Sequence, residues 1–110
     1  MKVLIYEGND GHAPYSEWLS ELRDQLAAAK IEVRIRRIRL GNLGHWEPVG
    51  EGVSELKIDW GPGYRVYFGR IGATVVVLLC GGDKKTQRKD IIKAKEFWLD
   101  FKERYHGKED

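Results

Sequence analysis

Residues 53–80, VSELKIDWGPGYRVYFGRIGATVVVLLC, decide the fold. In the first part, residues 53–59, apolar and charged side chains alternate, with Leu56 and Ile58 on one side. Such alternation is typical of a strand with one buried face. The sequence WGPG at residues 60–63 combines two glycines with a proline, and it predicts a tight turn.

Two more strands follow this turn. The segment YRVYFGR (64–70) alternates again, with Tyr64, Val66 and Phe68 on one face and Arg65 and Tyr67 on the other. After a break at residues 71–72, ATVVVLLC (73–80) is an uninterrupted apolar run, which is typical of a strand covered on both faces. Because the connections are short, the three strands are predicted to form an antiparallel meander.

Residues 2–6, KVLIY, predict a short strand before this meander. Pro14 then opens a helix at a position where its missing N–H group costs nothing. The apolar residues of this helix recur at helical spacing: Tyr15, Trp18, Leu19, Leu22 and Leu26. Residues 30–40 fit both a strand and a helix, because their apolar residues match either period.

The remaining segments complete the predicted domain. Residues 41–52 are rich in glycine and predict a loop that holds His45 and Trp46. Residues 86–106 predict a closing helix with Thr86 as N-cap and a stripe of Ala94, Trp98, Phe101 and Tyr105. Residues 1–110 are thus predicted to be one α+β domain, in which helices pack on a mostly antiparallel sheet.

Composition excludes several classes of protein. Cys80 is the single cysteine, so a disulfide framework and a thiol-rich metal site are excluded, and a small buried thiol is expected. Charge interrupts residues 1–10 too early for a signal peptide, and no apolar stretch approaches the length of a membrane span. We therefore expect a cytoplasmic protein.

Basic residues are concentrated in two segments, although the net charge is only +2. Residues 30–39 contain Glu32 as their one acid among five basic residues, and residues 84–95 contain Asp90 as theirs among six. This segregation predicts a positive surface and a polyanionic partner, such as a nucleic acid or an acidic protein. Two solvated helix faces are the alternative.

Strand alternation places Lys57 and Arg65 on the same face of the predicted sheet. Lys84 and Lys85 precede the closing helix, whose free N–H groups and positive dipole end favour phosphate. Three stretches thus offer positive groups that can converge on one anion. The alternatives are an ion pair between Arg65 and Glu55, and lysines that only face water.

The chain resembles the phage-derived, HigB-like killer proteins of the RelE/ParE superfamily of type II toxins. The segments that carry the resemblance are EWLSELRD, GVSELKIDWGPGYRVYF and LLCGGDKKTQRKDIIKAKEFW. The resemblance implies a small sheet with a helical hairpin on one side, and residues 30–40 as the second arm of that hairpin. It also implies that the opposite, concave face binds messenger RNA on the ribosome and cleaves it without a metal ion or other cofactor.

The resemblance also assigns roles to residues. Arg65 matches an arginine that contacts the scissile phosphate, Lys57 matches a lysine that acts as base or electrostatic stabiliser, and Lys84 lies near a further cationic position. Glu55 occupies a position where RelE-like enzymes carry another lysine, and the usual tyrosine or histidine of the last helix is absent. Since some members use a carboxylate and a histidine, Glu55 and His45 are the replacement pair.

Further RNA contacts are expected from Lys85, Tyr67 and Arg88. Trp46 and Trp60 either stack on a base or anchor their loops. The cluster Arg34–Arg39 is expected to lie far from the site. The expected partners are messenger RNA on the ribosome and a helix-turn-helix antitoxin. Two functions remain as alternatives: inhibition of DNA gyrase, as in ParE-like toxins, or an inactive relative that only binds nucleic acid or antitoxin.

Overall fold

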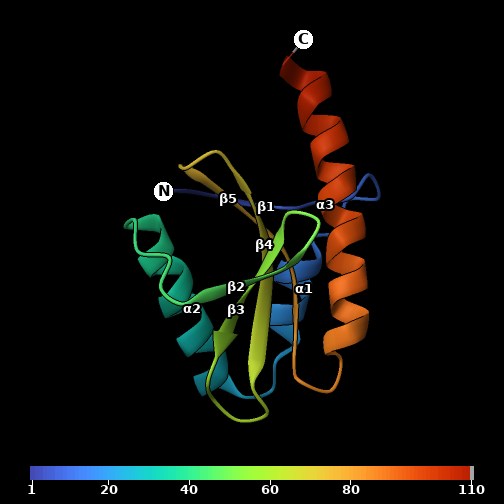
Figure 1. Cartoon of the computed structure of the whole chain (residues 1–110). Coiled ribbons are helices and arrows are strands. Elements are labelled where there is room, and N and C mark those ends of the chain that lie inside the picture. The colour runs from blue at the N-terminus through green and yellow to red at the C-terminus, as the bar shows by residue number, and fades with distance from the viewer. Residues whose placement is uncertain (110) are drawn as a thin grey trace.

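The three predicted strands form the centre of the sheet in a computed structural model that describes residues 1–109 and the side chains of residues 1–105. They are β3 (Val53–Ile58), β4 (Tyr64–Ile71) and β5 (Val75–Gly82), and they pair as an antiparallel meander, as predicted. Strand β1 (Lys2–Ile5) joins β5 in parallel, and β2 (Trp46–Gly50) joins β3. The result is an α+β fold with a five-stranded mixed sheet in the order β1-β5-β4-β3-β2 (Figure 1).

Strand β2 corrects the prediction of a loop at residues 41–52. It pairs with β3 in antiparallel register, with Glu47 opposite Glu55. It tolerates Pro48 because it is the edge strand of the sheet. A turn with positive φ angles at Gly50, Glu51 and Gly52, namely 107°, 55° and 82°, connects the two strands.

The ambiguous segment 30–40 is helical. It belongs to α2 (Gln25–Arg39), which follows α1 (Pro14–Glu21) after a short break. Leu26 therefore does not continue the stripe of the first helix; it lies on α2 and is 55% exposed. Asp24 causes the break, because its carboxylate caps α2 by accepting the backbone N–H groups of Leu26 and Ala27 at 3.0 and 3.1 Å.

The Asp24 carboxylate predicts a specific acid dependence of stability. It also accepts the indole N–H of Trp60 at 3.0 Å, and this bond, followed by the bonds from Ala27 and Leu26, holds the pKa of Asp24 below its ordinary value of 3.8. Because the folded pKa is the lower one, this stabilisation is complete above the unfolded pKa and is lost as the pH falls through the folded pKa.

We expect Asp24→Asn to remove this part of the acid dependence, since asparagine caps helices equally well without titrating. The measurement is the urea midpoint of both proteins from about pH 7 to about pH 2. Below about pH 4, where the wild-type carboxylate takes up its proton, the urea midpoint of wild type should fall relative to that of Asp24→Asn. Parallel curves over the whole range would contradict the assignment.

Helices cover both faces of the sheet (Figure 1). Helices α1 and α2 enclose one core that includes Ile31, Ile35, Leu56, Phe68 and Leu78. Helix α3 (Gln87–Glu109) encloses a second core on the other face, built around Val53, Tyr67, Val77, Leu79 and Trp98. Strand β5 contributes to both, which confirms that its apolar run is covered on two sides. Helix α3 therefore covers part of the face opposite α1 and α2, which is the face that the resemblance expects to bind messenger RNA.

Two glycines allow a tryptophan to lie directly on each face of the sheet. A Cβ atom at Gly81 would overlap the ring of Trp18 from α1, and one at Gly69 would overlap the ring of Trp98 from α3. Neither position tolerates a side chain without displacing a large ring, so both helices are fixed against the sheet at these points.

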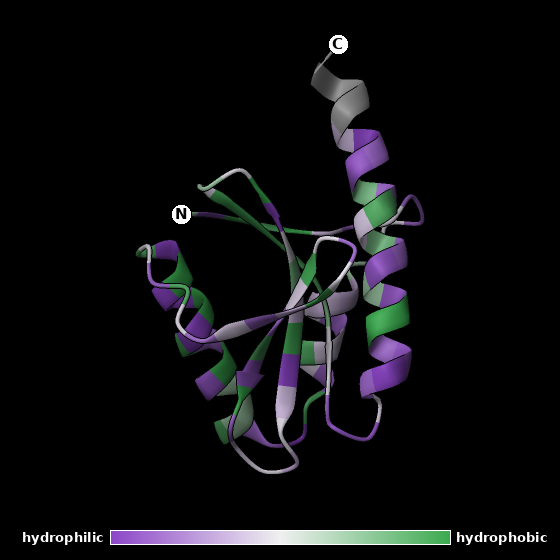
Figure 2. Ribbon diagram, viewed as in Figure 1, coloured by the Kyte–Doolittle hydropathy of each residue, from purple (hydrophilic) through white to green (hydrophobic). Residues whose placement is uncertain are grey.

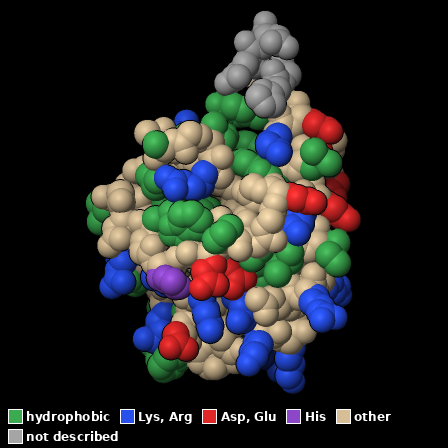
Figure 3. Space-filling model, viewed as in Figure 1, with side chains coloured by type: hydrophobic (Ala, Val, Ile, Leu, Met, Phe, Trp, Pro, Cys, Tyr) green, Lys and Arg blue, Asp and Glu red, His purple; other side chains and the backbone are tan. Residues whose placement is uncertain are grey.

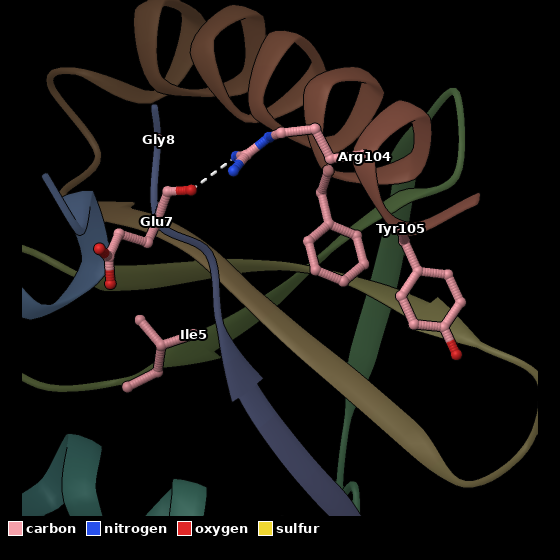
Figure 4. Close-up of a pocket in the computed structure, with 6 residues that line it drawn as sticks. Ile5, Glu7, Gly8, Arg104 and Tyr105 are labelled. Atoms are coloured by element: carbon pink, nitrogen blue, oxygen red, sulfur yellow. Dashed lines mark hydrogen bonds between the residues drawn. The ribbon is translucent and has the colours of Figure 1, made fainter. Parts of the chain in front are cut away.

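The C-terminal half of α3 is tied to the end of β1. The Arg104 guanidinium donates to the backbone carbonyl of Glu7 at 2.6 Å (Figure 4). It also donates to the Asp100 carboxylate at 2.7 Å. The same carboxylate accepts the hydroxyl of Tyr6 at 2.7 Å. Within residues 1–109, none of the helices combines the length and apolar character that crossing a membrane requires.

Candidate functional site

A cavity of about 480 Å³ opens where β2, β3 and β4 approach the beginning of α3. Its lining residues come from each of these elements and from the loops beside them: His45, Glu47, Glu55, Lys57, Asp59, Arg65 and Gln87. In Figure 3, which shows the face of Figure 1, a histidine lies beside acidic side chains, with lysine and arginine side chains directly below. The cavity therefore combines two cations with carboxylates and an imidazole.

Lys57 and Arg65 meet in this cavity, as strand alternation predicts. They are directly opposite each other in the antiparallel register of β3 and β4, and both line the cavity. Like charges at such a position are unfavourable, since directly opposed side chains are only about 5 Å apart at Cβ. A bound anion would relieve this repulsion.

Arg65 is held in place from two sides. It is 5% exposed, its Nη1 donates to the carbonyl of Gly63 at 2.9 Å, and its Nε lies 3.5 Å from Oε1 of Glu55. Nε has no hydrogen-bond partner among the described residues. Glu55, itself 7% exposed, also accepts a long bond of 3.4 Å from Gln87. The ion pair between Arg65 and Glu55, which the sequence left as an alternative, is thus present. It involves only the Nε side of the guanidinium, so most of the five N–H donors of Arg65 do not take part in it.

His45 also lines the cavity. Its position in a loop gave no indication from the sequence of which residues it would contact. Its Nε2 is 3.5 Å from Oε1 of Glu47, and both side chains are well exposed. Sequence reasoning paired His45 with Glu55 and missed Glu47, because only the pairing of β2 with β3 brings Glu47 opposite Glu55. The cavity thus contains an imidazole–carboxylate pair that is open to solvent.

Arg34 corrects the expectation that the cluster Arg34–Arg39 lies far from the site. Its guanidinium donates to the backbone carbonyl of Lys57 at 3.1 Å and to that of His45 at 3.2 Å. Burial, followed by the nearby charge of Arg37, lowers the pKa of Arg34. One side chain of α2 thus connects the loop before β2 to strand β3, directly behind two residues of the cavity.

We expect Arg34→Ala to loosen this loop. The loss of both hydrogen bonds should lower the free energy of unfolding by about 1 to 2 kcal/mol, since bonds to a charged donor are among the stronger ones. Amide hydrogen exchange should also accelerate in the loop before β2. The matched control is Arg36→Ala, which removes an exposed arginine from the same helix. Equal exchange rates in both variants would contradict the connecting role of Arg34.

The start of α3 departs from the expected phosphate site. Lys84, Lys85 and Arg88 are exposed, and the one residue of α3 that lines the cavity, among those described, is Gln87. The chain also satisfies its own N–H groups here, because the Asp83 carboxylate accepts those of Lys85 and Thr86 at 2.9 and 3.2 Å. The turn that leads into α3 is therefore already held by an acidic side chain, at the place where the sequence predicts a bound anion.

Three aromatic residues that the sequence offered as possible RNA contacts instead make contacts within the protein. Tyr67, an expected RNA contact, is fully buried under α3, and its hydroxyl has no hydrogen-bond partner within the described part of the chain. Burial raises its pKa. Trp60 donates to Asp24, and Lys30 lies 4.5 Å from its ring centre, which makes Trp60 an anchor of its loop. Trp46, 36% exposed, contacts Phe68 edge to face.

Comparison with known proteins identifies a close relative. The chain is 51% identical over 81 residues to a Haemophilus influenzae protein described as "Uncharacterized protein". The matched region covers 74% of this chain and 82% of that protein. No protein-family model matches the sequence.

Proposed function

The chain belongs to the same family as this Haemophilus influenzae protein, and from its cavity we propose that it is a toxin of the RelE/ParE superfamily that cleaves messenger RNA on the ribosome. The observation that carries the proposal is the meeting of Lys57 and Arg65 in one cavity with the His45–Glu47 pair. Two cations are suited to a phosphodiester, and an imidazole with a carboxylate is suited to proton transfer.

In the proposed reaction, the ribose 2′-hydroxyl attacks the adjacent phosphorus atom, so that the O2′–P bond forms and the P–O5′ bond breaks. The Glu47 carboxylate takes the hydroxyl proton, and protonated His45 gives a proton to the leaving O5′ atom. Lys57 and Arg65 stabilise the negative charge on the other phosphate oxygens. The products are a 2′,3′-cyclic phosphate and a 5′-hydroxyl end, and the reaction needs no metal ion.

The buried position of Arg65 supports its role as a fixed electrostatic group. Its contacts with Glu55 and Gly63 hold the guanidinium before substrate arrives. A preorganised charge at a site of low dielectric constant stabilises a transition state without a cost of reorganisation. In this proposal Glu55 positions Arg65 and does not act as the base, since Arg65 and Gln87 already occupy its oxygens.

The test is cleavage of labelled single-stranded RNA by the purified protein, with bacterial ribosomes in a magnesium buffer and, separately, without ribosomes in the presence of EDTA. We expect cuts that end in a cyclic phosphate, and we expect His45→Gln to reduce the rate by about 10²-fold. His12→Gln is the matched control, because His12 is also exposed and also pairs with a carboxylate, that of Glu17, outside the cavity.

Two results would reject this proposal. Equal rates for His45→Gln and wild type would remove His45 from the chemistry. Intact RNA together with inhibition of DNA supercoiling would support a gyrase inhibitor. The proposal also includes a helix-turn-helix antitoxin as partner, and co-expression of that partner should relieve growth arrest.

A further inference from the structure

Helix α2 has a second apolar stripe on the side that faces away from the core. The buried side consists of Ala27, Ile31, Ile35 and Ile38. The exposed stripe consists of Leu26, Val33 and Leu40, which follow one another at intervals of seven residues and are 55%, 40% and 81% exposed. Because seven residues make almost two turns, Leu26 and Val33 lie along one line of the helix, and Leu40, the residue that caps its C-terminal end, continues that line.

Exposed apolar side chains at this spacing differ from isolated surface leucines. Single apolar residues on a surface are ordinary, but a line of them at intervals of seven gives a continuous apolar strip on which a second helix can pack. Figure 2 shows α2 banded in hydrophobic and hydrophilic residues along its length. The helix has 15 residues and is therefore about 22 Å long, enough for three turns of a second helix.

Basic residues border the exposed stripe. Lys30 and Arg37 are exposed on one side of it and Arg36 on the other, whereas Glu32 is the one acidic residue in this part of the helix. Ala29 lies beside the stripe, between Leu26 and Val33 in the sequence, and lines a hollow on each side of α2, one of about 640 Å³ toward α1 and one of about 380 Å³ toward the end of β3. A small residue at this point permits a partner to approach the backbone of α2 closely.

We propose that this face of α2 binds an amphipathic helix of another protein, with apolar side chains at heptad spacing and carboxylates on their flanks. The apolar residues of the partner would pack on Leu26, Val33 and Leu40. Its carboxylates would face Lys30, Arg36 and Arg37. This inference concerns a surface outside the cavity, and it holds whether or not the protein cleaves RNA.

Two other occupants fit the surface less well. RNA binds through cations and aromatic rings, but the stripe has no aromatic residue among its described members, and the nearby ring of Trp60 is covered by Lys30. A second copy of this chain would bring the basic borders of two α2 helices together, which is unfavourable. An amphipathic helix with acidic flanks can pack on the apolar stripe and can also pair with the basic residues that border it.

The test uses a synthetic peptide of about 21 residues with leucines at the a and d positions of three heptads and glutamates at e and g. Its binding to the full-length protein is followed by fluorescence anisotropy. We expect wild type to bind, Val33→Glu to weaken binding by about tenfold or more, and about 0.5 M salt to weaken it several-fold. Val33→Glu keeps the helix intact, because glutamate favours helices more than valine does.

Leu99→Glu is the matched control, since Leu99 is 56% exposed on α3, away from α2. It should bind the peptide as wild type does, and circular dichroism should report the same fold for both variants. A scrambled peptide of the same composition should not bind. Absence of binding by wild type, equal binding of the scrambled peptide, or wild-type affinity in Val33→Glu would overturn the proposal.

The other occupants give different results. If a uridine oligonucleotide displaces the peptide, and binds to Val33→Glu but not to Arg37→Glu, the surface is a nucleic-acid site and the proposal is wrong. If sedimentation shows a dimer that Val33→Glu abolishes, the occupant is a second copy, and the proposal is wrong as well.

Discussion

Replacing Glu55 by alanine is expected to lower the free energy of unfolding by about 3 kcal/mol, because it leaves a buried guanidinium without its counter-ion. Arg65 and Glu55 are 5% and 7% exposed, and their charged atoms lie 3.5 Å apart. Among the described residues, Arg65 would then keep one side-chain hydrogen bond, which it donates to the carbonyl of Gly63 at 2.9 Å. Urea unfolding of both proteins at neutral pH measures the difference.

Two further variants separate loss of the pair from loss of a charge. Glu47→Ala, directly across from Glu55 on β2 but exposed, should cost about 0.5 kcal/mol or less. The double variant Glu55→Leu with Arg65→Met should recover stability to within about 1 kcal/mol of wild type, since apolar residues replace a buried ion pair well. A double variant as unstable as Glu55→Ala would show that the pair stabilises the fold directly.

In the proposed reaction Lys57 is one of two cations that face the phosphate, so Lys57→Ala should reduce RNA cleavage by about 10²-fold. Lys57 is exposed, so the free energy of unfolding should change by no more than about 0.5 kcal/mol. Single-turnover cleavage rates at saturating RNA measure the effect separately from binding.

Lys84→Ala is the control for this prediction. Lys84 is also an exposed lysine, and the resemblance implies a cationic position near it, but Lys84 is not among the described residues that line the cavity. Its rate should stay close to that of wild type. If instead Lys84→Ala loses activity and Lys57→Ala does not, the reacting phosphate lies at the start of α3 and not in the cavity between β3 and β4.

Most of the sheet could be predicted because its signals are local. Residues 53–80 carry their own turns and alternation, and each strand pairs with the next. Strand β2 could not be predicted in this way. Its residues 46–50 include Glu47, Pro48 and Gly50, and all but Val49 are exposed, so that no apolar alternation marks it. Its existence depends on the free edge of β3, which the local sequence does not encode.

The candidate site was predictable to the same extent. Alternation places Lys57 and Arg65 on one face, but the same rule places Tyr67 there too, and only the position of α3 decides that Tyr67 is buried. Arg34 and Gln87 were missed for a related reason. Their contacts with the site cross from α2 and α3 to the sheet, and no spacing within the sequence reports such contacts.

The position of β1 affects how the protein folds during its synthesis. This strand pairs with β5 alone in the described sheet, with Lys2 opposite Val75, so its neighbour is made far later on the translating ribosome. Closing so long a loop is entropically costly and comes late in folding. Helix α1 cannot dock on the sheet before β5 is made either, because the ring of Trp18 packs on Gly81. A nascent chain that stalls before β5 emerges therefore exposes the apolar side of α1 and α2, and the sheet assembles only after β5 has left the ribosome.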